Sequence, residues 1–196
     1  PEKLEAKNFL NELVEKALRS NNNAGQALAF VGTRKSTEAT AQEVCSVTKN
    51  YLSEAEQKQN KELADKTLKV FSPPTKQCRL LAKCIASGTA FHHAGLPAKQ
   101  RELIELGFKQ TRSIKAIVCT TTLAMGIDYP ASWVVVRDLK RFSGMYADYL
   151  KKLEVMQMLG RGGRPRYDRV GYGVLCCNPH ESEYVKEKYV FGPIED

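Results

Sequence analysis

Two arginines three residues apart stand among glycines in the segment 157–165, which reads QMLGRGGRP. A guanidinium is permanently charged, and its planar fork matches two oxygens of a phosphate. Arg161 and Arg164 could therefore neutralise the charge that develops on a transferred phosphoryl group, an effect of ~10³ or more in rate for arginine fingers. The alternative is a glycine-rich turn with two solvated arginines, and the spacing alone leaves both interpretations open.

A second polar cluster follows an apolar run that ends at Cys119. Thr120, Thr121 and Thr122 offer hydroxyl and backbone donors to phosphate oxygens, and Asp128 can accept a hydrogen bond from a ribose hydroxyl. Threonines after a strand also serve as helix N-caps, and this alternative stays open.

The adjacent histidines His92 and His93 could be metal ligands or an acid–base group. Neighbouring residues in a strand point to opposite faces, and the chain has only one other histidine, His180. No cysteine stands at the spacing of a zinc site. We therefore predict a packing or turn role for the histidine pair and no metal site.

The chain has 196 residues, of which 42% are hydrophobic, and this suits one compact domain over residues 1–196. The formal charge is +8, and residues 137–169 hold nine basic against four acidic side chains, so a polyanionic partner is expected. No apolar run reaches the ~18 residues of a membrane span, and no secretory leader is present. The six cysteines form no CxxC pair and are predicted to be reduced. These features predict a cytoplasmic protein, or a nuclear one in a eukaryote, without a membrane partner.

Apolar runs alternate with amphipathic segments along most of the chain, which predicts an α/β fold with a mostly parallel sheet and helices on both faces. The polar segment 53–76 is predicted to be a surface excursion outside the core. The predicted strands are 27–31, 89–91, 114–119, 133–136 and 173–177; the predicted helices are one from residue 9 to the turn-prone residues 21–25, and others near 36–52, 97–108, 154–159 and 181–188.

Ligands of such sheets bind where the strands end. We therefore expect four segments to be neighbours at the carboxyl ends of the strands: Thr33–Arg34, His92–His93, residues 120–128 and the segment around Arg161.

Taken together, these motifs resemble the second RecA-like motor domain of superfamily 2 helicases, in the Ski-like branch, and most closely the archaeal DNA-repair helicases of that branch. The resemblance covers most of residues 24–178. Its motifs are FVGTR at 30–34 (motif IV), HHAGL at 92–96 with Arg101 (motif IVa), residues 119–131 (motif V) and residues 157–164 (motif VI, QMxGRxGR).

The resemblance implies a role for each matching residue. Arg161 and Arg164 would reach the γ-phosphate of ATP, Arg164 in the finger position, with Gln157 in the same network. Gly126 and Asp128 would belong to the ATP site, and Asp128 would bind the ribose or couple the domains. The residues implied to hold the phosphates of the tracking strand are Thr33, Arg34, Arg101, Thr120 and Thr122.

The chain departs from the family pattern at two positions. Gly162 stands where close relatives usually carry Ala, and Asp128 stands where the repair helicases tend to have Asn. The first change is small, and the second leaves the contact of Asp128 less defined.

Between motifs V and VI the family often inserts a β-hairpin that separates the duplex. Residues 141–149 fill this interval and contain Phe142 and Tyr149, which could stack on the last base pair. The alternative is that these aromatic side chains pack beneath a loop.

The chain contains no G-x-x-x-x-G-K-[ST] motif and no DExH-type box, so it holds neither a phosphate cradle nor a magnesium ligand of that kind. We therefore expect a fragment that is inactive alone; the resemblance implies that its parent is an ATP-dependent 3′-to-5′ DNA helicase. ATP with Mg²⁺ would bind between this domain and the first RecA-like domain of the same parent chain, which would hold the metal. The nucleic-acid partner would be single-stranded or forked, with DNA preferred.

Three other interpretations remain. The first is an RNA helicase of the same branch, and the second is a non-catalytic nucleic-acid-binding module. The third, a small Rossmann-like enzyme, ranks last because the chain lacks G-x-G-x-x-G.

Overall fold

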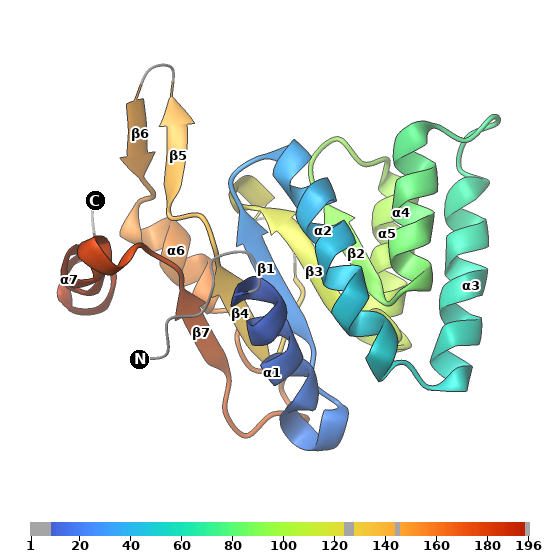
Figure 1. Ribbon diagram of the computed structural model, residues 1–196, viewed down its shortest axis with the longest axis horizontal. Coiled ribbons are helices and arrows are strands. Elements are labelled where there is room, and N and C mark those ends of the chain that lie inside the picture. The colour runs from blue at the N-terminus through green and yellow to red at the C-terminus, as the bar shows by residue number, and fades with distance from the viewer. Residues whose placement is uncertain (1–8, 124–127, 144–145, 195–196) are drawn as a thin grey trace.

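The computed structural model describes residues 9–123, 128–143 and 146–194. Its main sheet has five parallel strands in the order β2-β3-β1-β4-β7, with β1 at the centre (Figure 1). The strands are β1 (Ala27–Val31), β2 (Thr89–His92), β3 (Ala116–Thr120), β4 (Trp133–Val136) and β7 (Tyr172–Leu175). The predicted mostly parallel sheet is confirmed.

Helices cover both faces of this sheet, as predicted. α1 and α2 lie on the near face in Figure 1, and right-handed crossovers between parallel strands place α5 and α6 on the far face. The helices are α1 (Phe9–Asn23), α2 (Arg34–Thr48), α3 (Glu54–Leu68), α4 (Lys76–Ala86), α5 (Ala98–Glu105), α6 (Lys152–Leu159) and α7 (Ser182–Lys186). Short helical turns occupy Lys49–Tyr51, Leu106–Gln110, Thr121–Leu123, Pro179–Glu181 and Glu187–Phe191.

The first helix ends where the sequence predicts. Asn21, Asn22 and Asn23 have φ of 51°, 57° and 64°, in the left-handed region that asparagine tolerates better than most residues. The chain then enters β1, which is buried along its whole length because it is the central strand.

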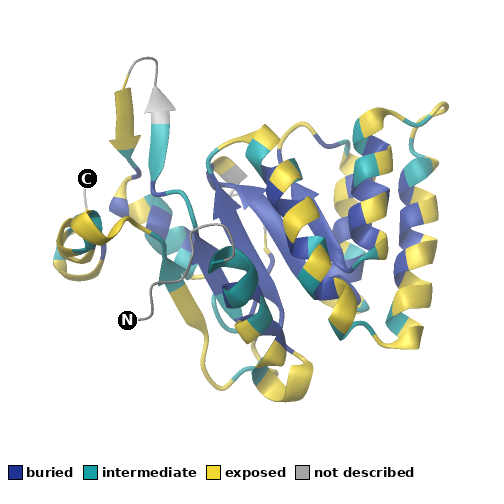
Figure 2. Cartoon of the chain, in the orientation of Figure 1, coloured by how far each residue is buried: buried dark blue, intermediate teal, exposed yellow. Residues whose placement is uncertain are grey.

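The segment 53–76 is not the surface excursion that we predicted. It forms α3, which begins with a capping box between Ser53 and Glu56 and packs against α4 at the edge of the sheet. Leu63 and Ala64 belong to the main core, whereas the outer face of α3 is exposed (Figure 2). The prediction is wrong for the inner face, because a helix needs only a narrow apolar stripe to dock.

A two-stranded antiparallel hairpin stands apart from the main sheet. Its strands are β5 (Lys140–Ser143) and β6 (Tyr146–Tyr149), and it projects beyond the carboxyl ends of the parallel strands beside α7 (Figure 1). No helix of the described residues is long and apolar enough to cross a membrane.

Candidate functional site

The arginines of motif VI lie in a turn, residues 160–164, that we call the arginine turn. It follows the end of α6 and pairs with Ala131: the Ala131 N–H donates to the Arg161 carbonyl (3.0 Å), and the Gly163 N–H donates to the Ala131 carbonyl (2.7 Å). Ala131 lies two residues before β4, so the arginine turn lies at the edge where the parallel strands begin, the amino edge. In Figure 1 the connection from α6 to β7 runs below the sheet.

This position corrects one prediction. We expected the segment around Arg161 at the carboxyl ends of the strands, beside Thr33–Arg34, His92–His93 and residues 120–128. The expected edge is wrong, because α6 runs antiparallel to the strands and returns the chain to the opposite edge. The expected proximity to residues 120–128 is confirmed at Asp128.

Arg161 lies at the surface of the arginine turn. Its Nη1 is 3.2 Å from Oδ1 of Asp128, and the two side chains are 27% and 77% exposed. Lys109 Nζ lies 3.5 Å from the other oxygen of Asp128. The structure therefore brings together Arg161 and Asp128, as the sequence predicts for the nucleotide site, and adds Lys109, which the sequence analysis missed. Lys109 Nζ also lies 3.1 Å from Glu105 of α5, so this exposed cluster holds two cations and two carboxylates.

Arg164 points in the opposite direction. It is 3% exposed, and its guanidinium donates to both oxygens of Asp168, each at 2.8 Å. Nη1 donates to the Ala24 carbonyl (2.8 Å) and to Oε1 of Gln26 (3.0 Å). The prediction that Arg164 stands open in the finger position is wrong for this conformation, because the charged group is buried against the start of β1.

Asp168 is the counter-charge of this network. Its side chain is 0% exposed, and it also accepts hydrogen bonds from the Arg164 backbone N–H (2.8 Å) and the Ser132 hydroxyl (3.3 Å). Burial alone would raise the pKa of Asp168, but the hydrogen bonds and charge of Arg164 outweigh it and lower the pKa. A signal was present in the sequence, since Asp168 follows Arg164 by four residues.

Two other residues were predicted for the nucleotide site. Gln157 is half-buried on α6, and its buried Oε1 accepts no hydrogen bond within the described part of the chain. Gly126 lies outside the described residues.

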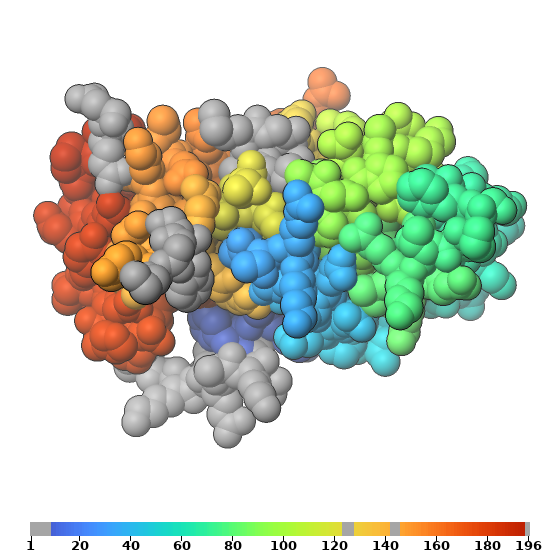
Figure 3. Space-filling view, turned by 90° about the horizontal axis from the view of Figure 1, so that it is seen from above, coloured from blue at the N-terminus to red at the C-terminus, as the bar shows by residue number. Residues whose placement is uncertain are grey.

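The predicted phosphate-binding residues come from the opposite, carboxyl edge of the sheet. The strand register places Val31 beside Thr120 and His92 beside Cys119, so the segments that follow β1, β2 and β3 meet there. Figure 3 looks onto this edge, where the start of α2, the segment before α5 and the end of β3 lie close together.

The individual side chains at the carboxyl edge differ in exposure. Thr33 caps α2, its hydroxyl accepting from the Ser36 N–H (3.1 Å), while Arg34 on α2 and Arg101 on α5 are exposed. Thr120 is 4% exposed and accepts a hydrogen bond from the exposed Thr122 (3.2 Å). Thr122 is therefore the hydroxyl of this pair that a ligand can reach.

The histidine pair packs inside this edge, which confirms the packing and turn role. His93 Nδ1 accepts from the Gly95 N–H (3.1 Å), and Nε2 lies 3.3 Å from Glu38. Burial lowers the pKa of His93, against the opposing effect of Glu38, and burial with the nearby Arg101 lowers the pKa of His92 to about 4. No group of three or more His, Cys, Asp or Glu is placed to hold a metal ion among the described residues.

The hairpin changes the interpretation of its aromatic residues. The Tyr149 ring lies 4.8 Å from that of Tyr184, and its hydroxyl donates to Glu181 (2.7 Å), so the packing alternative is correct for Tyr149 and its assignment to the wedge is wrong. The structure does not describe the side chain of Phe142. Tyr146, which we did not single out, is 72% exposed near the hairpin tip, and its position two residues after Gly144 could have identified it.

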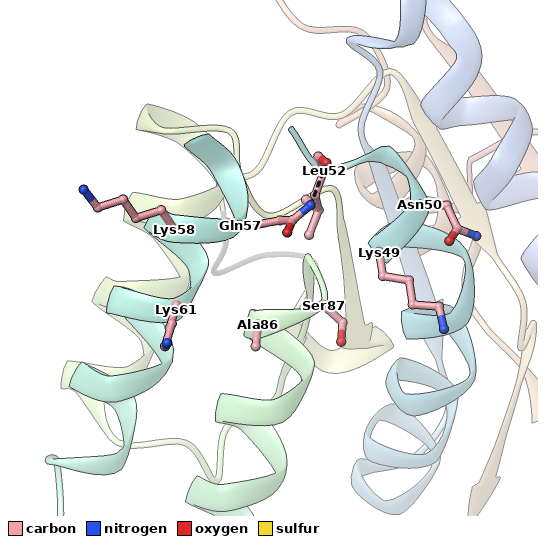
Figure 4. Close-up of a pocket in the computed structure, with 8 residues that line it drawn as sticks. All are labelled: Lys49, Asn50, Leu52, Gln57, Lys58, Lys61, Ala86 and Ser87. Carbon is pink, nitrogen blue, oxygen red and sulfur yellow. Dashed lines mark hydrogen bonds between the residues drawn. The ribbon is translucent and has the colours of Figure 1, made fainter. Parts of the chain in front are cut away.

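A cavity of about 700 Å³ lies between α3 and the ends of α2 and α4 (Figure 4). Lysines stand around it, but Lys58 and Lys49 point away from the opening in Figure 4. None of the predicted site residues lines it; the lining residues are Lys49, Asn50, Leu52, Gln57, Lys58, Lys61, Ala86 and Ser87.

A parallel sheet covered on both faces, with arginines presented at its edge, is a RecA-like α/β domain. Residues 57–166 match the helicase conserved C-terminal domain, and the chain belongs to that family.

Relatives support the same assignment over almost the whole chain. The chain is 41% identical over 183 residues to the ATP-dependent DNA helicase Hel308 of Methanocella arvoryzae, which covers 92% of the chain and 24% of that protein. It is 39% identical over 193 residues to Hel308 of Pyrococcus horikoshii, with 98% and 26% covered, and 35% identical over 182 residues to Hel308 of Thermoplasma acidophilum, with 92% and 24% covered. The chain thus spans about a quarter of the length of these relatives.

Proposed function

We propose that this domain is the second motor domain of an ATP-dependent helicase that moves 3′ to 5′ along single-stranded DNA. The observation that carries the proposal is the exposed Arg161–Asp128 pair in a chain of the helicase C-terminal family. ATP would bind between this amino edge and the first RecA-like domain of the parent chain, which would hold the Mg²⁺.

In this proposal Arg161 is the arginine finger. Its guanidinium already engages an exposed carboxylate, and the γ-phosphate offers the same pair of oxygen acceptors with more charge. Closure of the two domains would exchange Asp128 for the phosphate, which leaves Asp128 with Lys109 or a ribose hydroxyl as partner. Binding energy in the cleft would drive this hinge closure, and hydrolysis would remove the contact and let the domains separate again.

The carboxyl edge would hold the tracking strand. Arg34, Arg101, Thr33 and Thr122 present cationic and hydroxyl donors to phosphates, with Thr120 supporting Thr122 from inside. Phosphate contacts carry no sequence information, which suits a motor that steps along any sequence. We favour DNA over RNA because the relatives are DNA helicases by name.

The hairpin β5–β6 would separate the duplex ahead of the motor. Its outer strand residues are exposed, and Tyr146 is the aromatic side chain best placed to stack on a terminal base pair. Phe142 of β5 remains part of this proposal.

The test compares Arg161→Ala with Arg169→Ala in the full-length parent helicase. Arg169 is an exposed arginine of the same loop and serves as the matched control. We expect Arg161→Ala to lower DNA-stimulated ATP turnover by ~10³, the effect of removing an arginine finger, with little change for Arg169→Ala. Unchanged turnover in Arg161→Ala would contradict the proposal.

Two further measurements address the alternatives. Stimulation of the parent ATPase by RNA but not by DNA of the same sequence would favour the RNA helicase. ATP turnover by the isolated chain at the rate of an intact helicase would refute its role as half of a motor; we expect no meaningful ATPase and weak, salt-sensitive DNA binding.

A further inference from the structure

The root of the hairpin is attached to the C-terminal segment, residues 178–194. Lys140 and Tyr149 are directly opposite each other, the innermost pair of β5 and β6. Both donate to the same carboxylate oxygen, Oε1 of Glu181: Lys140 through its ammonium group and Tyr149 through its hydroxyl (2.7 Å). One side chain therefore holds both strands.

Glu181 is itself fixed by the turn that carries it. Its Oε2 accepts from the Asn178 side-chain amide (3.0 Å), and its own side chain is 16% exposed. The hydrogen bonds from Lys140 and Tyr149 lower the pKa of Glu181 to about 2, so the carboxylate is charged at neutral pH.

Neighbouring contacts tighten the same attachment. The ammonium group of Lys140 lies 4.6 Å from the centre of the Tyr149 ring, whose other neighbour is Tyr184 of α7 at 4.8 Å. The Tyr189 hydroxyl donates to the carbonyl of Leu150, the residue that follows β6 (2.7 Å). Two elements of the C-terminal segment thus contact the hairpin root.

The outer part of the hairpin projects away from the five-stranded sheet (Figure 1). Tyr146, Ala147 and Asp148 are exposed, and a salt bridge between Arg141 and Glu154 (3.0 Å) links β5 to α6. An isolated two-stranded hairpin is at best marginally stable, so the attachment at its root determines its direction.

We propose that Glu181 is a positioning residue that fixes the strand-separating hairpin relative to the motor domain, an inference that rests on the proposed function. The hairpin can separate a duplex junction only if its orientation relative to the domain is fixed. Glu181 fixes this orientation by joining both strands to the C-terminal segment.

The test uses the full-length parent helicase and compares Glu181→Gln with Glu183→Gln. Glu183 lies two residues further along, is 87% exposed and pairs with Lys186 (2.8 Å), so it controls for loss of a negative charge in this segment. We expect Glu181→Gln to slow unwinding of a forked DNA roughly tenfold, the size expected when a hydrogen bond to a charged group is lost. ATPase stimulated by single-stranded DNA should stay within about twofold, because neither nucleotide nor tracking-strand residues change.

Two further variants keep the inference testable if Glu181→Gln folds poorly. Tyr149→Phe removes only the hydroxyl and should slow unwinding without slowing the ATPase. Reversing the charges with Lys140→Glu and Glu181→Lys together should recover more unwinding than either single change, since the pair can form again.

The outcomes separate the inference from the function on which it rests. A parent chain that unwinds no DNA refutes the proposed function and this inference with it. A parent that unwinds, while Glu181→Gln and Tyr149→Phe match Glu183→Gln, refutes the inference alone. Parallel loss of unwinding and ATPase in these variants also overturns it, because a positioning role in the hairpin predicts their separation.

Discussion

Replacing each arginine of the arginine turn by Ala should have opposite effects on stability and catalysis. Arg164 and Asp168 are 4% and 0% exposed, and removal of one partner from a buried ion pair costs about 3–5 kcal/mol because the other charge is left uncompensated. Asp168 keeps the Arg164 backbone N–H and the Ser132 hydroxyl as donors in Arg164→Ala, so we expect the lower part of that range. Arg161 and Asp128 form an exposed pair, whose loss costs roughly 0–1 kcal/mol.

Thermal unfolding of the chain measures this difference. For a domain of this size 1 kcal/mol corresponds to roughly 2–4 °C in Tm, so Arg164→Ala should melt at least about 6 °C below the unchanged chain and Arg161→Ala within about 4 °C of it. The difference should persist at high salt, because buried pairs are screened less than exposed ones. ATP turnover in the parent should show the opposite order. Arg161→Ala should be inactive although it is stably folded.

One result would refute this reasoning. If Arg164→Ala melts with the unchanged chain and loses as much turnover as Arg161→Ala, Arg164 acts in the cleft and the buried network is not its working position. Arg164→Lys is the intermediate case, because it keeps the charge but loses the planar guanidinium that engages both oxygens of Asp168. Its Tm should fall between those of Arg164→Ala and the unchanged chain.

Three other predictions concern His92, Gly171 and Arg34. The pKa of His92 is about 4 in the folded chain and about 6.5 in the unfolded chain, so the unfolded chain binds the proton first as the pH falls. The free energy of unfolding, measured with urea, should therefore decrease by up to roughly 3 kcal/mol between pH 6.5 and pH 4. His92→Gln should flatten this decrease. A Cβ at Gly171 would lie 2.4 Å from backbone atoms of the arginine turn, so Gly171→Ala should destabilise the chain by about 1–3 kcal/mol and lower ATP turnover. Gly32→Ala is the control and should do neither, because a Cβ there has no neighbour closer than 3.5 Å. Arg34→Ala should weaken binding of single-stranded DNA and reduce the salt slope of log K by about one; an unchanged slope would remove Arg34 from the phosphate contacts.

Most of the sheet could be predicted from the sequence because β1, β2, β3 and β4 are buried along nearly all of their length, whereas the edge strand β7 is partly exposed. Residues 133–136 match β4 at both ends, and 27–31 match β1, since an uninterrupted apolar run is typical of a covered parallel strand. α3 could not be recognised in the same way. Its inner face includes the polar residues Asn60 and Thr67, both 0% exposed, so polarity did not mark its exposed side.

The edge that carries the arginine turn depends on element lengths that the motifs do not contain. α6 has 8 residues and so spans about 12 Å, close to the length of a strand of four or five residues. A helix of this length that starts at the carboxyl edge must deliver the chain to the amino edge. The rule that ligands meet the carboxyl ends of strands applies to the loops after β1, β2 and β3, whereas residues 160–164 precede a strand.

The difference between Arg161 and Arg164 is set by residues far from motif VI in the sequence. The motif spacing does not distinguish the two arginines. The Ala24 carbonyl and the Gln26 side chain, which lie far earlier in the sequence, accept hydrogen bonds from Arg164. To reach a phosphate, Arg164 would have to leave Asp168 buried without its counter-charge, whereas Arg161 exchanges one exposed carboxylate for another anion. We therefore propose that domain closure on a nucleotide would engage Arg161 at the lower cost, while Arg164 would hold the turn that presents it.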